Sequence, residues 1–183
     1  NVESLERIDV VDISKQILEL SEVVYPGPGE NPLEDSRVRV HVEDGRYFLQ
    51  TTPERFDLIT GEPPPPKMAG VVNLYTREYF ELVRSRLKPG GINTYWLPVH
   101  QLQEHDARAI LGAYCGAFPD CSLWNGSGLD WMLVGSRDAE GQGSESAFSL
   151  QWEDPAVGAQ LRELGIEVPE QLGALFIADA EQL

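Results

Sequence analysis

Glu62 has a carboxylate directly after a predicted strand, a position at which a protein of the α/β class can use it for chemistry. It follows a short apolar run at residues 56–60 and starts a loop stiffened by four prolines at 63–66, after which a helix is expected to begin at Thr76. Open α/β sheets bind their ligands beyond the carboxyl ends of their strands. A carboxylate there can accept a proton, so this order of parts favours a nucleotide-type transferase.

Asp12 is a second acidic residue at the end of a predicted strand, residues 8–13. In a nucleotide-binding βαβ unit, the acidic residue at this place accepts hydrogen bonds from both ribose hydroxyls. Each bond to a charged acceptor contributes about 1.5 to 3 kcal/mol, enough to set the affinity for a nucleoside. Asp12 can equally be a strand-end or helix-capping aspartate, just as Asp44-Gly45 can be an ordinary turn.

The elements that must position these residues alternate between strand and helix. Runs with the composition or alternation of strands lie at residues 8–13, 37–42, 56–60, 92–97, 121–124 and 131–135. Capping residues and apolar spacing predict helices that start after Ser14, span 46–51, run from Thr76 to about Leu87 and span 104–117, with two short terminal helices containing Leu161 and Phe176. Pro89-Gly90-Gly91 is expected to stop the helix that Thr76 caps.

This order of parts resembles the spermidine synthase, or polyamine aminopropyltransferase, family. The resemblance runs from about Ile8 to Ser136 and rests on the segments FDLITGEPPPP at 56–66, LYTREYF at 74–80 and LKPGG at 87–91. It is nearest to the divergent spermidine-synthase-like domains, which are often fused to membrane segments. It implies a Rossmann-like, doubly wound sheet of the S-adenosylmethionine-methyltransferase type, strand order 3-2-1-4-5-7-6, mostly parallel with an antiparallel carboxyl-terminal edge.

The family's first strand and its glycine-rich turn have no counterpart in this sequence. That strand would lie between the strand that ends at Asp12 and the strand that ends at Thr60. Three explanations are open: those two strands pair directly, another segment fills the gap, or the chain is a fragment. We favour the fragment, because a gap at the centre of the sheet would leave backbone groups unpaired, and each costs about 1 to 3 kcal/mol if buried. We therefore expect a truncated α/β domain at 1–140, a Gly/Ser loop and helical extension at 141–183, and no activity in the isolated chain.

The resemblance also implies roles for single residues. It assigns cofactor binding to Asp12, Ile13, Asp44 and Gly45: Asp12 matches the acidic residue that binds ribose, Asp44 accepts from the adenine amino group, and Gly45 lets the backbone approach the ring. Glu62 aligns with the first aspartate of the family's DSSDP loop. The co-substrate implied is decarboxylated S-adenosylmethionine, the product is methylthioadenosine, and no metal is expected.

Aminopropyl transfer explains why a carboxylate is needed at this place. An amine is protonated at pH 7, and deprotonating it costs about 4 to 5 kcal/mol. Glu62 can take that proton while the sulfonium departs as neutral methylthioadenosine. Glutamate in place of aspartate adds one methylene, which moves the acceptor by about an ångström unless the loop shifts.

The amine half of the site is less well matched than the nucleoside half. The loop's second aspartate, which helps to hold the cationic polyamine, falls at Pro65, which has no charge and no donor. Tyr75 and Tyr79 are expected to share a helix face and line the pocket mouth, although such a pair is also typical of a core. Two alternatives therefore stay open: a non-catalytic nucleoside-binding domain and an S-adenosylmethionine-dependent methyltransferase.

Composition limits the partners. The formal net charge of -16 argues against nucleic acid, which needs a basic face, and is compatible with a small cationic amine. Cys115 and Cys121 are too few for a disulfide framework and are expected to be packing thiols. With no long apolar run, we expect a cytoplasmic location, alone or as the soluble part of a membrane-fused protein. The resemblance implies a homodimer.

Overall fold

The computed structural model describes residues 5–126, 128–138 and 145–183. They belong to two compact units, one that reaches to Pro53 and one that starts at Glu54. The loop expected at 141–146 lies mostly outside the described residues, and its last two residues belong to a helix. The domain boundary expected near residue 140 stays a prediction. None of the described helices combines the length and the apolar character that crossing a bilayer requires.

The first unit is built on two parallel strands. Its elements are β1 (Ile8–Asp12), α1 (Lys15–Glu19), α2 (Ser21–Val24), η1 (Pro32–Glu34), β2 (Val38–Val42) and α3 (Gly45–Thr51). Ile8 lies opposite Val38 and Asp12 opposite Val42. The side chain of Ser14 accepts a hydrogen bond from the backbone of Ile17 and so caps α1, as the sequence predicts.

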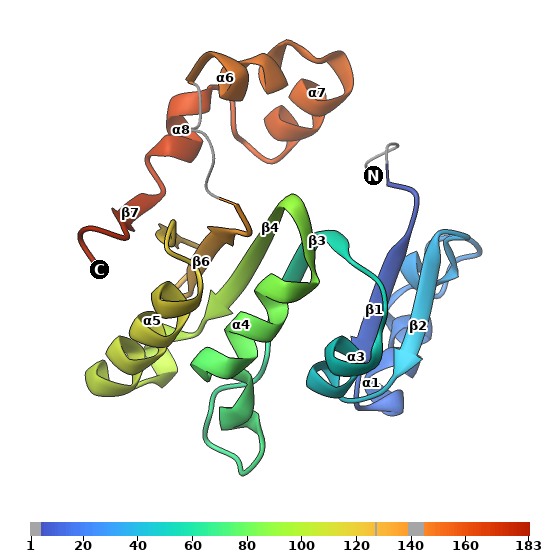
Figure 1. Ribbon diagram of the computed structural model, residues 1–183. Helices are drawn as coiled ribbons and strands as arrows, with labels where there is room; N and C mark the ends of the chain where they lie inside the picture. The colour runs from blue at the N-terminus through green and yellow to red at the C-terminus, as the bar shows by residue number, and fades with distance from the viewer. Residues whose placement is uncertain (1–4, 127, 139–144) are drawn as a thin grey trace. The chain divides into compact units, whose positions relative to one another are not determined.

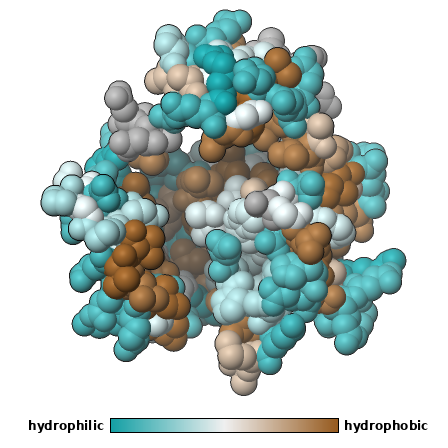
Figure 2. Space-filling model, turned by 180° about the vertical axis from the view of Figure 1, so that it is seen from behind, coloured by the Kyte–Doolittle hydropathy of each residue, from teal (hydrophilic) through white to brown (hydrophobic). Residues whose placement is uncertain are grey.

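Apolar side chains remain exposed on this unit. The exposed fraction is 58% at Ile17, 72% at Val23 and 64% at Val24, all on α1 and α2. Figure 2 shows brown, hydrophobic side chains gathered in patches among teal ones on the face that it presents.

The second unit is built on one five-stranded sheet in the order β3-β4-β6-β5-β7. Its strands are β3 (Phe56–Gly61), β4 (Leu87–Leu97), β5 (Ser122–Asn125), β6 (Trp131–Ser136) and β7 (Phe176–Asp179). Its helices are η2 (Val71–Leu74), α4 (Arg77–Arg86), η3 (Val99–Gln101), α5 (Glu104–Ala117), α6 (Glu145–Glu153), α7 (Pro155–Glu163) and α8 (Pro169–Gly173). The long helices α4 and α5 lie side by side on one face of this sheet (Figure 1).

The strand order confirms the expected fold class. β3 and β4 are parallel, and β6, β5 and β7 add an antiparallel edge. Within the second unit, the order β3-β4-β6-β5 matches the 4-5-7-6 part of the expected order, and the first unit has the separate pair β1-β2. Among the described strands β1 pairs only with β2 and β3 only with β4, so the direct pairing considered above is not found.

The core of the second unit is aromatic. The Tyr95 side chain on β4 meets Phe80 of α4 edge to face, with ring centroids 5.0 Å apart, and Phe80 meets Tyr114 of α5 at the same distance. Asn93 is also buried, and the Tyr114 hydroxyl donates to its Oδ1 over 3.0 Å. Alternate residues of β4 therefore face the two helices, which follows from the two-residue period of a strand.

β4 begins earlier than the sequence indicates. The helix α4 ends at Arg86, and Leu87 already pairs with Phe56, so the Pro-Gly-Gly segment lies within the strand and does not stop the helix. The next pair is Leu58 with Ile92, so the intervening residues form an irregularity that accommodates a proline without a backbone N–H. Gly91 is required there, because a Cβ would lie 2.9 Å from the carbonyl oxygen of Phe56.

The end of the chain contains a strand in place of part of the second expected terminal helix. Phe176 belongs to β7, which pairs antiparallel with β5, and its ring lies 5.4 Å from that of Trp124. The two helices α7 and α8 precede it. A four-residue strand whose partner lies about fifty residues earlier has no local signature strong enough to outweigh an apolar spacing that also suits a helix.

The expectation that the two cysteines are free thiols is wrong. Cys115, in the last turn of α5, forms a disulfide with Cys121, which precedes β5. The chain turns back at the end of the helix and brings the two Cα atoms to 5.2 Å, within the range that a disulfide needs. A separation of six residues is therefore sufficient for a bridge in a chain with only two cysteines.

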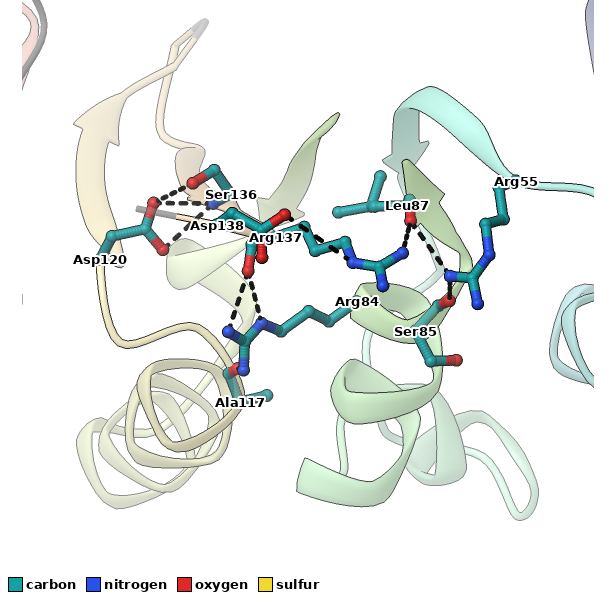
Figure 3. Close-up of polar contacts among 9 residues, drawn as sticks. All are labelled: Arg55, Arg84, Ser85, Leu87, Ala117, Asp120, Ser136, Arg137 and Asp138. Carbon is teal, nitrogen blue, oxygen red and sulfur yellow. Dashed lines mark hydrogen bonds and ion pairs between the residues drawn. The ribbon is translucent and has the colours of Figure 1, made fainter. Parts of the chain in front are cut away.

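Three arginines hold the amino end of β4 and the carboxyl end of β6 (Figure 3). Arg84 donates to the carbonyl oxygen of Arg137 at 2.9 and 3.1 Å and to that of Ala117 at 3.3 Å. Arg137 donates to the carbonyl of Leu87, and Arg55 donates to the same carbonyl over 3.4 Å. These contacts satisfy carbonyl groups left free at the ends of helices and strands.

Candidate functional site

The nucleoside residues of the sequence prediction lie at one edge of the first unit. β1 and β2 are parallel, so Asp12 with Ile13 and Asp44 with Gly45 follow the carboxyl ends of adjacent strands. The backbone N–H of Glu43 donates to the carbonyl of Asp12 over 3.0 Å and ties the two strand ends together. This is the edge at which an open α/β sheet binds ligands.

Asp12 has both a structural contact and a free acceptor. Its Oδ1 accepts from the backbone N–H of Ser14 over 2.7 Å, which fixes the turn into α1. Its Oδ2 has no hydrogen bond among the described residues, so it remains able to accept from a ligand hydroxyl. Ile13 is 73% exposed beside it.

Asp44 is the residue that caps α3. Its Oδ1 accepts from the backbone N–H of Tyr47 over 2.8 Å, and its side chain is exposed. A Cβ at Gly45 would meet nothing within 4 Å, so no described neighbour requires glycine there. The capping role of Asp44 is therefore observed, and the nucleoside role of Asp44 and Gly45 stays a prediction.

Glu62 follows β3 directly and is exposed. Its carboxylate has no hydrogen bond or ion pair among the described residues. The preceding residue, Gly61, allows the Tyr95 ring to lie against the chain, because a Cβ there would come within 2.7 Å of that ring. The strand end is thus fixed by the core while the carboxylate stays available.

Tyr75 anchors the proline loop that carries Glu62. Its hydroxyl lies 3.1 Å from the carbonyl oxygen of Pro63 and 3.0 Å from that of Pro64, and donates its single proton to this pair. Burial raises the pKa of Tyr75 to about 12, so the hydroxyl stays a donor at neutral pH. Tyr95 in turn donates to the carbonyl of Leu74 over 2.6 Å, which holds the segment before Tyr75.

A pocket of about 580 Å³ lies in the second unit next to this loop. Three segments form it: the end of the proline loop, the approach to α4, and the stretch from η3 into α5. Its lining residues are Pro66, Lys67, Val72, Tyr75, Thr76, His100, Gln101, Leu102, Gln103, Asp106, Ala109 and Ile110. Because β3 and β4 are parallel, the segments that follow their carboxyl ends meet at one edge of the sheet.

The two tyrosines of the prediction differ in position. Tyr75 precedes α4 and lines the pocket, whereas Tyr79 lies on α4, so they do not share a helix face. The Tyr79 ring packs in the core, 6.2 Å from that of Tyr95 and 5.7 Å from that of Phe80. A substrate contact by Tyr79 stays a prediction.

Sequence reasoning missed Lys67 and Asp106, both of which line the pocket. The position of each gave a signal: Lys67 directly follows the fourth proline, and Asp106 lies in the first turn of the helix after β4. His100 also lines the pocket, with Nδ1 at 3.2 Å from Oδ1 of Asp130. Among the described residues, no group of three or more His, Cys, Asp and Glu side chains is arranged to hold a metal ion.

The comparison with protein families identifies one match. The family described as "Spermine/spermidine synthase domain" matches residues 1–124. A spermidine synthase of Coffea arabica is 31% identical over 107 residues, an alignment that covers 55% of this chain and 33% of the relative. The chain therefore spans about a third of the length of this curated relative.

Two solved structures show the same fold. A spermidine synthase in complex with the transition state analogue AdoDATO gives a TM-score of 0.65 at 15% identity, covering 76% of this chain and 49% of that one. Human methyltransferase-like protein 13 in complex with SAH gives a TM-score of 0.62 at 17% identity, covering 85% and 71%. At these identities the two likenesses show the fold.

Proposed function

Because the chain belongs to the spermine/spermidine synthase family, we propose that it is part of a transferase that moves an aminopropyl group from decarboxylated S-adenosylmethionine to a small amine. The observation that carries the proposal is Glu62: an exposed carboxylate, free of described partners, at the carboxyl end of β3, on a loop anchored beside a pocket. Fold likeness alone would not select this reaction.

Glu62 acts as the general base in this proposal. It accepts a proton from the acceptor amine and orients the nitrogen lone pair. The nitrogen attacks the aminopropyl carbon next to the sulfonium, the new C–N bond forms as the C–S bond breaks, and the electron pair of that bond returns to sulfur. The products are neutral methylthioadenosine and the extended amine.

The first unit supplies the nucleoside contacts. Oδ2 of Asp12 accepts from the ribose hydroxyls, and Asp44 accepts from the adenine amino group, with Ile13 and Gly45 beside them. Support comes from the parallel register of β1 and β2, which puts both aspartates at one edge, and from the nucleoside-type ligands in the two solved relatives.

Calorimetric titration with methylthioadenosine, and separately with S-adenosylhomocysteine, tests the nucleoside site. We expect tighter binding of methylthioadenosine, weakened by about tenfold or more in Asp12→Ala, because a charged acceptor is lost. Glu22→Ala, an exposed glutamate on α2, is the matched control and should bind like the unaltered chain. Binding that is unaffected by Asp12→Ala would contradict the assignment.

Two other functions have an observation in their favour. Pro65 lacks the charge that would hold a polyamine, which favours a domain that binds the nucleoside without turnover. The likeness to methyltransferase-like protein 13 favours methyl transfer on the same fold. In a protein that joins this chain to the family's first strand and glycine-rich turn, nucleoside binding without release of methylthioadenosine for any amine would select the first function. A preference for S-adenosylhomocysteine would select the second.

A further inference from the structure

The volume and the apolar lining of the pocket beside the proline loop suit a short alkyl amine. Its volume of about 580 Å³ falls within the range of about 300 to 1,000 Å³ that is usual for small-molecule sites. Val72, Leu102 and Ile110 supply apolar wall for a methylene chain. The charged groups in the lining then decide which end groups the pocket accepts.

Those charged groups are of both signs. Lys67 and Asp106 both line the pocket. Oδ1 of Asp106 lies 3.2 Å from Nε2 of His105, and its other oxygen has no partner among the described residues. A diamine that is cationic at both ends would meet a carboxylate at one place and an ammonium at another.

The Lys67 side chain lacks a partner in the described part of the chain. Its ammonium forms no hydrogen bond or ion pair among the described residues. Lys88, by contrast, lies 2.8 Å from Asp57, and Arg108 lies 2.7 Å from Glu104. An unpaired cation in a pocket wall is available to an anionic group of a ligand.

The neighbouring loop strengthens this reading of the charges. Position 65, where the family resemblance implies a polyamine-holding carboxylate, is a proline, and the next charged residue of the loop is the cation Lys67. The loop thus lacks a negative charge at position 65 that would attract a second ammonium, and it carries a positive charge at Lys67 that repels one. Like charges in a site lower its affinity for a ligand and so contribute to specificity alongside favourable contacts.

We propose that the acceptor is an amine that also carries a carboxylate, an amino acid of the ω-amino type, with its carboxylate at Lys67 and its ammonium at Asp106. This inference rests on the proposed function and names its substrate class.

A matched pair of ligands tests the inference. 4-Aminobutanoate and 1,4-diaminobutane have chains of the same length and differ in one end group, carboxylate against ammonium. Titration of the chain followed by NMR should give tighter binding of 4-aminobutanoate. Tighter binding of 1,4-diaminobutane, or no binding of either, would overturn the inference.

Charge reversal at Lys67 gives the second arm of the test. Lys67→Glu should weaken 4-aminobutanoate by about tenfold, since it replaces attraction by repulsion at an exposed site, and should strengthen 1,4-diaminobutane. Lys88→Glu makes the same change of net charge outside the pocket and should leave the ratio of the two affinities unchanged. Asp106→Asn should weaken both ligands. An unchanged ratio in Lys67→Glu would contradict the proposal.

The two proposals fail in different ways. Binding of methylthioadenosine together with a preference for 1,4-diaminobutane would leave the transferase standing and reject the amino acid acceptor. A preference for 4-aminobutanoate that Lys67→Glu reverses, without nucleoside binding, would keep the pocket assignment and reject the transferase.

Discussion

The backbone around Glu62 is held in place by its neighbours, while the Glu62 carboxylate is exposed. Gly61 packs under the Tyr95 ring, and Tyr75 holds the two carbonyls that follow Glu62, yet the carboxylate itself is exposed and has no described partner. A general base needs that combination, because its position must be set and its lone pair must be unoccupied.

Replacing Glu62 by glutamine tests this role. Glu62→Gln keeps the size of the side chain and removes the basic oxygen. In a protein that joins this chain to the family's first strand and glycine-rich turn, the rate of methylthioadenosine release in the presence of an amine should fall by about 10² to 10⁴, as is typical for loss of a general base. Binding of methylthioadenosine should be unchanged. Glu163→Gln, an exposed glutamate on α7, is the control. A rate within a factor of about two of the unaltered chain would rule out proton transfer through Glu62.

At the scale of elements, arginine side chains connect strand ends to helix ends by hydrogen bonds to backbone carbonyls. The Arg84 guanidinium on α4 bonds the carbonyls of Ala117, at the end of α5, and of Arg137, just beyond β6 (Figure 3). One side chain thereby connects three elements that are far apart in sequence. Local sequence patterns carry no sign of such a contact.

Arg84→Met should therefore destabilise the second unit. It keeps much of the apolar stem and removes the donors, leaving two carbonyls without that partner, and we expect a loss of about 1.5 to 3 kcal/mol in the free energy of unfolding. Arg108→Met is the matched control: it removes an exposed pair with Glu104 on one helix, which contributes about 0.2 to 0.5 kcal/mol. Urea unfolding followed by tryptophan fluorescence measures both. Equal losses would show that Arg84 is not a structural anchor.

The elements also show what a sequence can predict. Strands β1, β2 and β3 and helices α3, α4 and α5 were predicted, because each has a local cause, such as the Thr76 cap whose Oγ1 accepts from Tyr79 over 3.2 Å. The early start of β4, the strand at Phe176 and the disulfide were not, because each depends on a partner distant in sequence or on a turn of the chain.

The candidate site divides in the same way. Residues at strand ends, such as Asp12 and Glu62, could be found from the pattern of apolar runs and breaks. The sequence shows that Lys67 follows the proline loop, but not that it lines a pocket, since the pocket depends on three segments that meet only in the folded sheet.

For the whole molecule, the division into two compact units suggests separable stabilities. In the first unit, Arg7 and His41 both contact the carboxylate of Asp9, at 2.6 and 2.8 Å. Burial opposes ionisation of Asp9, but the hydrogen bonds and charges of these partners outweigh it and lower its pKa below 3.8. A lowered pKa stabilises the fold above the pKa of the unfolded chain, and this stabilisation is lost as pH falls through the folded value.

Acid should therefore unfold the first unit selectively through Asp9. All four tryptophans, Trp96, Trp124, Trp131 and Trp152, belong to the second unit. Below about pH 4, far-ultraviolet circular dichroism should report loss of structure before tryptophan fluorescence changes. Asp9→Asn should lower the stability of the first unit at pH 7 and flatten its acid dependence. A single transition seen equally by both probes would contradict the prediction.

The anchored proline loop has a consequence for the thermodynamics of recognition. Four consecutive prolines restrict the backbone, and the Tyr75 hydroxyl holds the carbonyls of the first two, so the loop is already ordered when the chain has folded. A ligand that enters beside it does not have to immobilise a flexible segment, and the entropy of that ordering is lost during folding instead. Affinity at this place should consequently depend on the match between end groups and side chains, and little on induced closure.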